Sequence, residues 1–360
     1  MPPWPKPCLR QRGNEKMEDF GSWSVLTTNF LIVLYLALSG ALFPVILHLA
    51  GGKWRVQIRF LSGAVTSLFP IAFILLLILL LNGEMTFPWL KNAHAEEAHL
   101  PGWHNYSFLV ARQIIGFLIV AGLSVAAIRC QYVSEADREK HRPKMFGKLA
   151  VIMPFAYIIY GTMIAWDFEM TLEPGWHSAS YGAYQLQSAF HGFLGFFVLM
   201  LFILDRSGRL TRVFDPKIYN YLAQFILAMS IMWVYFYFTQ YLIMWYGRLP
   251  TDMERYWRMI DEGYMLLGMT FLVLKFFIPF SLFLFKRMRH SPSVIMMVGF
   301  CVILGTWIER YVWVSGSSPS QYYHIPLSNT FDIAVTAGII AISALALIWT
   351  LMHWWLIRHD

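Results

Sequence analysis

The chain has 360 residues, of which 58% are hydrophobic, 17% aromatic and only 14% charged. Soluble globular domains carry about 25% charged residues, so this composition excludes an ordinary soluble protein. The net charge of +7 does not indicate a nucleic-acid partner, because basic residues of a membrane protein gather in the loops that stay in the cytoplasm.

Nine apolar segments are each long enough to cross about 30 Å of hydrocarbon. They lie at residues 27–50, 57–82, 107–129, 147–166, 181–204, 217–246, 263–286, 292–313 and 331–355. Residues 1–26 contain no apolar core of signal-peptide type and are predicted to lie outside the membrane. The sequence therefore predicts an all-α, polytopic bundle of about nine spans, with residues 27–356 forming a single transmembrane domain.

The charges of the loops predict the orientation of the bundle. Seventeen Lys and Arg residues lie at 51–59, 129–148, 205–217, 286–290 and the C-terminus, against five in the alternate loops. The positive-inside rule places the richer set, and with it the C-terminus, in the cytoplasm. Four basic residues before the first span oppose this orientation. The alternate loops hold ten of the 21 carboxylates, including Asp167 and Glu169, which predicts an acidic outer face.

The three cysteines, Cys8, Cys130 and Cys301, are scattered and form no Cys-x-x-Cys pair. They predict neither a disulfide framework nor an iron–sulfur ligand set, so we expect no metal site in this chain. A b-type haem needs two histidines that face each other at one depth. His48 and His353 share an approximate depth, and a haem-bearing cytochrome therefore stays open as an alternative.

Ionisable residues inside spans are costly and are functional candidates by default. Arg112 lies in the third span and Asp167 closes the fourth span at the same membrane face, so the two side chains are predicted to pair. Such a pair either orients a quinol hydroxyl and carries protons, or staples two helices together. The first role predicts that Asp167→Asn lowers turnover in an assembled complex, and the second that assembly fails.

Three further ionisable residues extend this set. His191 and Lys275 fall near the middle of the fifth and seventh spans, where they form part of a proton relay or each bond a neighbouring hydroxyl or carbonyl. Glu309, beside Arg310 at the end of the eighth span, is predicted to lie at the membrane interface. The candidate proton path comprises Arg112, Asp167, His191, Lys275 and Glu309.

Two aromatic-rich motifs end spans at the outer face. The first runs from Ala165 to Ser178 and reads AWDFEMTLEPGWHS, and the second runs from Trp233 to Tyr246 and reads WVYFYFTQYLIMWY. Both resemble motifs of the membrane subunits of alternative complex III, a bacterial quinol:electron-acceptor oxidoreductase in the polysulfide-reductase (NrfD-like) group, and in particular its second quinone-site-type subunit. The matching residues are Asp167, Met170, Leu172, Pro174, Trp176 and Ser178, then Trp233, Tyr235, Phe238, Gln240, Tyr241, Trp245, Tyr246 and Pro250.

The chain departs from the pattern of that family in four places. The segment from Tyr221 to Gln224 lacks the family's Asp-Leu-Gly-Lys, and Arg248 replaces an Asn. Thr251 with Asp252 replaces a Glu pair, and Lys275 stands where relatives tend to have His. The family also tends to have ten spans.

The resemblance implies paired four-helix bundles in a bacterial cytoplasmic membrane. It also implies quinol oxidation near the outer face, with electrons passing to iron–sulfur clusters and c-type haems in partner subunits and no cofactor held by this chain. The implied partners are a homologous membrane subunit, an iron–sulfur protein, multihaem and monohaem cytochromes c, small membrane subunits and lipids. The candidate quinone pocket comprises Asp167, Glu169, Trp176, Gln240, Tyr241 and Trp245.

The homologous first membrane subunit is the better candidate for the productive quinol site by the same resemblance. We therefore expect a scaffold or proton-handling role here, and no catalytic residue is assigned. A stand-alone secondary transporter is the competing class, and it would show paired broken helices and internal symmetry.

Overall fold

The computed structural model describes residues 20–92, 102–136, 143–208, 215, 217–247, 250–316 and 325–356. All regular elements of these residues are helices. The long ones are α1 (Phe20–Leu49), α2 (Arg55–Ala64), α3 (Phe69–Leu81), α6 (Tyr106–Ala136), α7 (Pro143–Ala165), α8 (Tyr181–Arg206), α9 (Lys217–Tyr246), α10 (Pro250–Met259), α11 (Met265–Leu272), α14 (Pro292–Ser315) and α15 (Thr330–Leu356).

Short helical segments complete the described chain. They are the 3₁₀ helix η1 (Val65–Leu68), α4 (Gly83–Thr86), α5 (Trp89–Asn92), the π-helical turns η2 (Trp166–Met170), η3 (Ile260–Tyr264) and η4 (Val273–Phe277), α12 (Ile278–Phe283) and α13 (Lys286–Arg289). The segment before residue 20, with Cys8 and the basic residues that oppose the predicted orientation, lies outside the described residues.

Nine helical stretches of the described chain are long and apolar enough to cross a membrane. Each coincides with a predicted span to within a few residues, because the hydrocarbon thickness fixes the length of an apolar helix. The first stretch begins at Ser22 rather than near residue 27. The predicted all-α, multi-pass membrane fold is confirmed.

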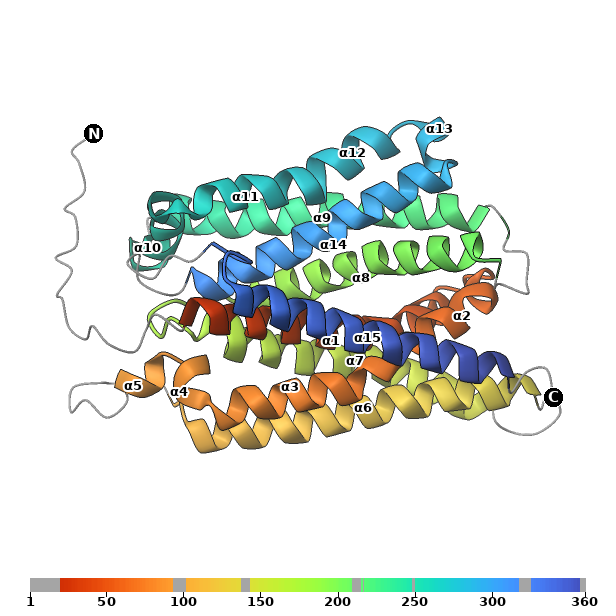
Figure 1. Cartoon of the computed structure of the whole chain (residues 1–360), viewed down its shortest axis with the longest axis horizontal. Coiled ribbons are helices and arrows are strands. Elements are labelled where there is room, and N and C mark those ends of the chain that lie inside the picture. The colour runs from red at the N-terminus through yellow and green to blue at the C-terminus, as the bar shows by residue number, and fades with distance from the viewer. Residues whose placement is uncertain are drawn as a thin grey trace.

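The spans run side by side along the long axis of the molecule (Figure 1). The start of α1 lies at one end together with α4, α5 and α10, whereas α2 and α13 lie at the other end with the C-terminus. Basic residues such as Arg55, Arg129, Arg206 and Lys286 belong to the second end, which we call the basic end.

Helix α1 lies in the centre of the bundle, in contact with α2, α3, α6, α7, α8, α14 and α15. One of its buried polar residues, Asn29, is bound by two distant spans. Its Nδ2 donates a hydrogen bond to Thr336 Oγ1 of α15 at 2.9 Å, and its Oδ1 accepts one from Trp307 Nε1 of α14 at 2.8 Å.

Helix α8 is the other central element, between α7 on one side and α9 and α14 on the other. Its contact with α14 is close because Gly195 and Gly299 face each other. A Cβ atom on Gly195 would lie 2.6 Å from the carbonyl oxygen of Gly299, and one on Gly299 would lie 2.8 Å from that of Gly195. Small residues allow such an approach of two membrane helices, and this approach brings the polar face of α8 against α14.

Candidate functional site

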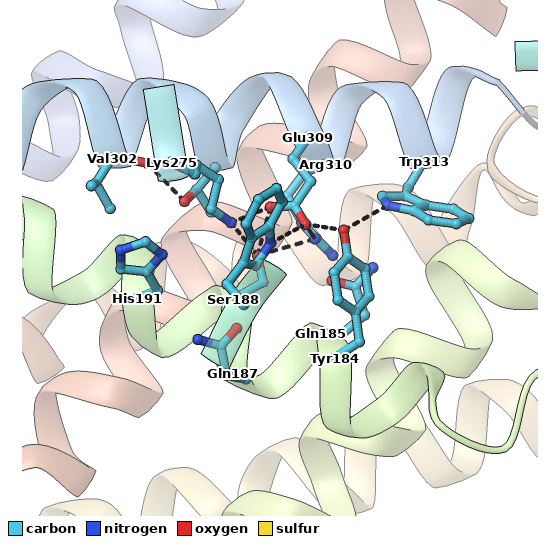
Figure 2. Close-up of polar contacts among 12 residues, drawn as sticks. Tyr184, Gln185, Gln187, Ser188, His191, Lys275, Val302, Glu309, Arg310 and Trp313 are labelled. Carbon is cyan, nitrogen blue, oxygen red and sulfur yellow. Dashed lines mark hydrogen bonds and ion pairs between the residues drawn. The ribbon is translucent and has the colours of Figure 1, made fainter. Parts of the chain in front are cut away.

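A cluster of ionisable side chains lies buried between α8, α9, α14 and the π-helical turns η2 and η4 (Figure 2). Glu309 of α14 is its centre. The Glu309 carboxylate accepts hydrogen bonds from Ser188 Oγ at 2.6 Å and Trp233 Nε1 at 2.9 Å, and from the Tyr184 hydroxyl. It also forms ion pairs with Lys275 and with Arg310, whose Nη2 lies 2.9 Å away. We call this group the Glu309 network.

Arg310 joins a second carboxylate to the Glu309 network. Its Nη1 lies 2.8 Å from Glu169 Oε2 and 3.1 Å from Glu169 Oε1. Glu169 also accepts hydrogen bonds from the Tyr181 hydroxyl at 2.6 Å and from Gln185. Two carboxylates and two cations are thus balanced within the protein interior, as burial of charge requires.

Lys275 enters the network from the π-helical turn η4. Its Nζ donates to Ser188 Oγ at 2.6 Å and lies 4.7 Å from the centre of the Trp233 ring. Single π-helical turns inside α-helices recur at functional sites. The lysine therefore sits on an irregular turn and is surrounded by hydroxyl, carboxylate and aromatic partners.

The network contains groups that exchange protons and a group that does not. Arginine stays protonated in proteins, whereas a lysine or a carboxylic acid can exchange a proton. If a proton moves from Lys275 to Glu309, both groups become neutral, and the Arg310–Glu169 pair keeps its charges. Ser188 contacts both Lys275 and Glu309. The arrangement can therefore move a proton without leaving an unpaired charge in the interior.

Arg255 of α10 closes the network on the side away from the basic end. This buried guanidinium donates to the carbonyl oxygens of Glu169 at 3.0 Å and Trp313 at 2.8 Å, and lies 4.5 Å from the centre of the Trp176 ring. Burial lowers the pKa of Arg255, although arginine remains charged. Arg255 thus donates to carbonyl oxygens in the last turns of η2 and α14. Carbonyl groups at the end of a helix lack a hydrogen-bond partner within that helix.

A second buried cluster surrounds Asp167. Arg112 donates to Oδ2 through Nε at 2.8 Å and to Oδ1 through Nη2 at 2.5 Å. Trp103 Nε1 donates to Oδ1 at 2.7 Å, and Gln113 donates to Oδ2. The predicted contact of Arg112 with Asp167 is confirmed. Because each carboxylate oxygen already accepts two hydrogen bonds, we conclude that Asp167 has no free acceptor position for a quinol hydroxyl.

The structure divides the predicted quinone pocket. Asp167 faces α6, whereas Glu169, two residues later, faces α14, because side chains two apart point to different sides of a helix. Trp176 packs 5.6 Å from the Trp313 ring near Glu169, and Tyr241 reaches the same region through Tyr256.

The remaining two residues of the predicted pocket, Gln240 and Trp245, differ in burial. Gln240 is buried near Tyr256. Trp245 is 56% exposed on the outside of the bundle. The predicted set therefore does not form one cavity around Asp167.

Three candidate histidines occupy separate places. His191 lies one turn from Ser188 toward the basic end, and its Nε2 is 3.1 Å from Ser230 Oγ, so the expected bond to a neighbouring hydroxyl is present. The His48 ring meets the edge of Phe146, and His353 stacks on Trp349. Among the residues that the structure describes, no three His, Cys, Asp or Glu side chains converge as in a metal site.

Several predictions from loop position are wrong. Glu309 was expected at the interface, and Asp167 and Glu169 on an acidic outer face, but all three are fully buried. Arg255 and Arg310, two of the five basic residues predicted to lie in the alternate loops, are buried as well. Each of these residues has a partner of opposite charge within 4 Å, and that partner makes burial possible.

The sequence interpretation did not include Ser188, Tyr184, Trp233 or Arg310 in the site. Helical spacing carries a signal for the first two, since Tyr184, Ser188 and His191 recur at three- and four-residue intervals on one face of α8. No such signal exists for Trp233, which reaches Glu309 only through the packing of α9.

No protein-family model matches the chain, and a search of curated proteins finds no relative of it.

Proposed function

We propose that the chain is an integral membrane subunit of a quinol:electron-acceptor oxidoreductase of the alternative complex III type, and that its Glu309 network handles protons. The observation that carries the proton-handling role is the contact of Lys275 with Ser188 and Glu309 inside the bundle. Buried ionisable residues in membrane spans are functional-site candidates by default, and proton relays are one of their known uses. The two aromatic-rich motifs supply the link to the complex.

The proposed path begins with His191 on the basic side of the network and continues through Lys275, Ser188 and Glu309. Figure 2 shows His191 beside the network, with no bond to the other residues drawn. A proton therefore needs one or more water molecules to pass from His191 to Lys275. Buried polar groups without a protein partner bind such waters, and His191 Nδ1 is without a hydrogen-bond partner among the described residues.

Direct quinol oxidation is the less favoured role for this chain. A quinol site needs an acceptor for each hydroxyl proton and an apolar slot for the ring. Asp167, the carboxylate first considered for that task, already accepts two hydrogen bonds from Arg112 and one each from Trp103 and Gln113. The proposal therefore assigns Asp167 to the joining of α6 and α7 and assigns the quinol chemistry to a homologous membrane subunit.

The same proposal places the redox cofactors in partner subunits. An iron–sulfur protein and multihaem and monohaem cytochromes c would carry the clusters and c-type haems, small membrane subunits would complete the assembly, and quinone would bind within the membrane. The chain would lie in a bacterial cytoplasmic membrane with its basic end in the cytoplasm.

Co-purification tests the assignment to a complex. Mild detergent extraction followed by mass spectrometry is expected to recover a multihaem cytochrome and a large iron–sulfur protein with the chain. Recovery of the chain alone would overturn the assignment and favour a stand-alone transporter, whose irregular helices line an ion path. A b-type band in the visible spectrum of the isolated chain would instead support the membrane cytochrome.

A further inference from the structure

An apolar groove opens on the outside of the bundle between η1, α3, α6 and α15. It has a volume of about 430 Å³, and its residues are Thr66, Ser67, Phe69, Pro70, Phe73, Phe117, Leu118, Val125 and Thr350. This volume lies in the range of ligand sites, about 300–1,000 Å³. The groove belongs to the membrane-spanning part of the chain, so it faces hydrocarbon.

Each of the three walls of the groove carries a basic residue toward the basic end. Arg59 precedes Thr66 by seven residues, Arg129 follows Val125 by four, and His353 follows Thr350 by three. Residues at these intervals share one face of a helix. At 1.5 Å of rise per residue, the three lie about 10, 6 and 4.5 Å beyond the lining residues.

The approach from the groove to Arg129 and His353 is open. Both of these residues are exposed, whereas Arg59 of α2 is mostly buried, with its guanidinium over the Phe60 ring. Apart from the backbone of α6 itself, no atom of the described residues lies within 4 Å of the position that a Cβ of Gly122 would take, on the turn between Leu118 and Val125. The α6 wall is therefore open between these two residues, and the exposed Arg129 lies one turn beyond Val125.

We infer that this groove binds one anionic phospholipid, with an acyl chain along its apolar lining and its phosphate between Arg59, Arg129 and His353. Basic residues between membrane helices bind the headgroups of anionic lipids. Arg59 and Phe73 are separated by about 21 Å of helix at 1.5 Å per residue, and one leaflet contributes about 15 Å of hydrocarbon. A phospholipid, with its headgroup and glycerol added to one leaflet of chain, has the matching length and charge.

Lipid titration of the delipidated full chain tests this inference. The chain is kept in neutral detergent, and its unfolding temperature is followed by tryptophan fluorescence during addition of phosphatidylglycerol or phosphatidylcholine. Phosphatidylglycerol is expected to raise the unfolding temperature at the lower lipid concentration. Arg129→Gln should require about fivefold more phosphatidylglycerol for half the effect, the factor expected for one basic residue at the headgroup, and should leave the phosphatidylcholine curve unchanged.

Arg206→Gln is the matched control, because Arg206 is exposed at the same end on α8, outside the groove. A second variant, Val125→Trp, fills the groove from an exposed position and is expected to abolish the preference for phosphatidylglycerol. Equal effects of the two lipids on the unmodified chain would overturn the inference. Equal losses in Arg129→Gln and Arg206→Gln would also overturn it, since they would show a response to surface charge alone.

Discussion

Asp167 and Glu169 belong to the same π-helical turn, yet they enter clusters of different chemistry. Asp167 is held by the guanidinium of Arg112 and by two neutral donors, Trp103 and Gln113, none of which releases a proton readily. Glu169 is connected through Arg310 to Glu309 and Lys275, where a lysine, a carboxylate and a hydroxyl are in direct contact. Both carboxylates are buried, so burial alone does not distinguish the two clusters. The difference is the exchangeable cation, Lys275, on which the proposed proton-handling role of the second cluster depends.

Among the substitutions that test the difference between the two clusters, removal of Arg310 should cause the largest loss of stability. Arg310→Met leaves the carboxylates of Glu169 and Glu309 buried without their shared cation, and loss of one partner of a buried pair costs about 3–5 kcal/mol. We expect little folded protein, measured as the monodisperse fraction after detergent extraction. The double variant Arg310→Met/Glu169→Gln should recover part of the loss, and strict additivity of the two changes would argue against direct coupling.

Asp167→Asn comes next in expected size. The asparagine keeps one acceptor oxygen but leaves Arg112 without a counter-charge, at a cost of about 2–4 kcal/mol in unfolding free energy. The amount of folded protein should fall, whereas proton release per assembled complex should stay unchanged. Normal stability combined with lost proton release would reverse the roles of the two clusters.

Substitutions of Lys275 distinguish the effect of its charge from the effect of proton exchange within the Glu309 network. Lys275→Met should cost less than the roughly 3–5 kcal/mol expected for Arg310→Met, because Glu309 retains Arg310 and its neutral donors. Lys275→Arg keeps the positive charge but cannot release a proton at physiological pH. Both variants should lose quinol-dependent proton release from the purified complex, measured with a pH indicator. Unchanged release in Lys275→Arg would exclude the lysine from the path.

The smallest expected effect is the pH dependence of stability that comes from His104, which follows Trp103 in the loop before α6. Burial lowers the pKa of His104 from its usual 6.5, opposed by a hydrogen bond to the Thr171 carbonyl oxygen and by Asp167. The folded state therefore favours the neutral ring, so its stabilising contribution is present above pH 6.5 and decreases as the pH falls below that value. Unfolding temperatures between pH 7.5 and 5.5 should fall less in His104→Gln than in the unmodified chain, and identical slopes would contradict this assignment.

Hydropathy predicted the nine spans because lipid leaves a helix little choice of length or composition. The boundaries of the spans also predicted the Arg112–Asp167 contact, because they placed both residues at the same end of neighbouring spans. They failed for Glu309, because nearness to the end of a span does not show whether a side chain faces water or another helix. Burial of Glu309 depends on Lys275 and Arg310 being brought together by folding.

The predicted quinone pocket failed for a reason that local geometry already contained. Asp167 and Glu169 are two residues apart, and such residues do not share a helix face. The pocket was predicted from residues that lie at the same end of the membrane, without regard to the direction of each side chain. Membrane depth and helix face together would have divided the set, although neither identifies the partner helix.

The bonds of Asn29 have a consequence for the biogenesis of the chain. Its two partners, Trp307 and Thr336, are separated from it by 278 and 307 residues, so α1 is synthesised long before either partner. During that interval the amide is either solvated at the translocon or exposed to lipid, where an unpaired polar group is costly. Maturation of the first span therefore waits for the last, and loss of α15 during synthesis should expose a degradation signal in α1.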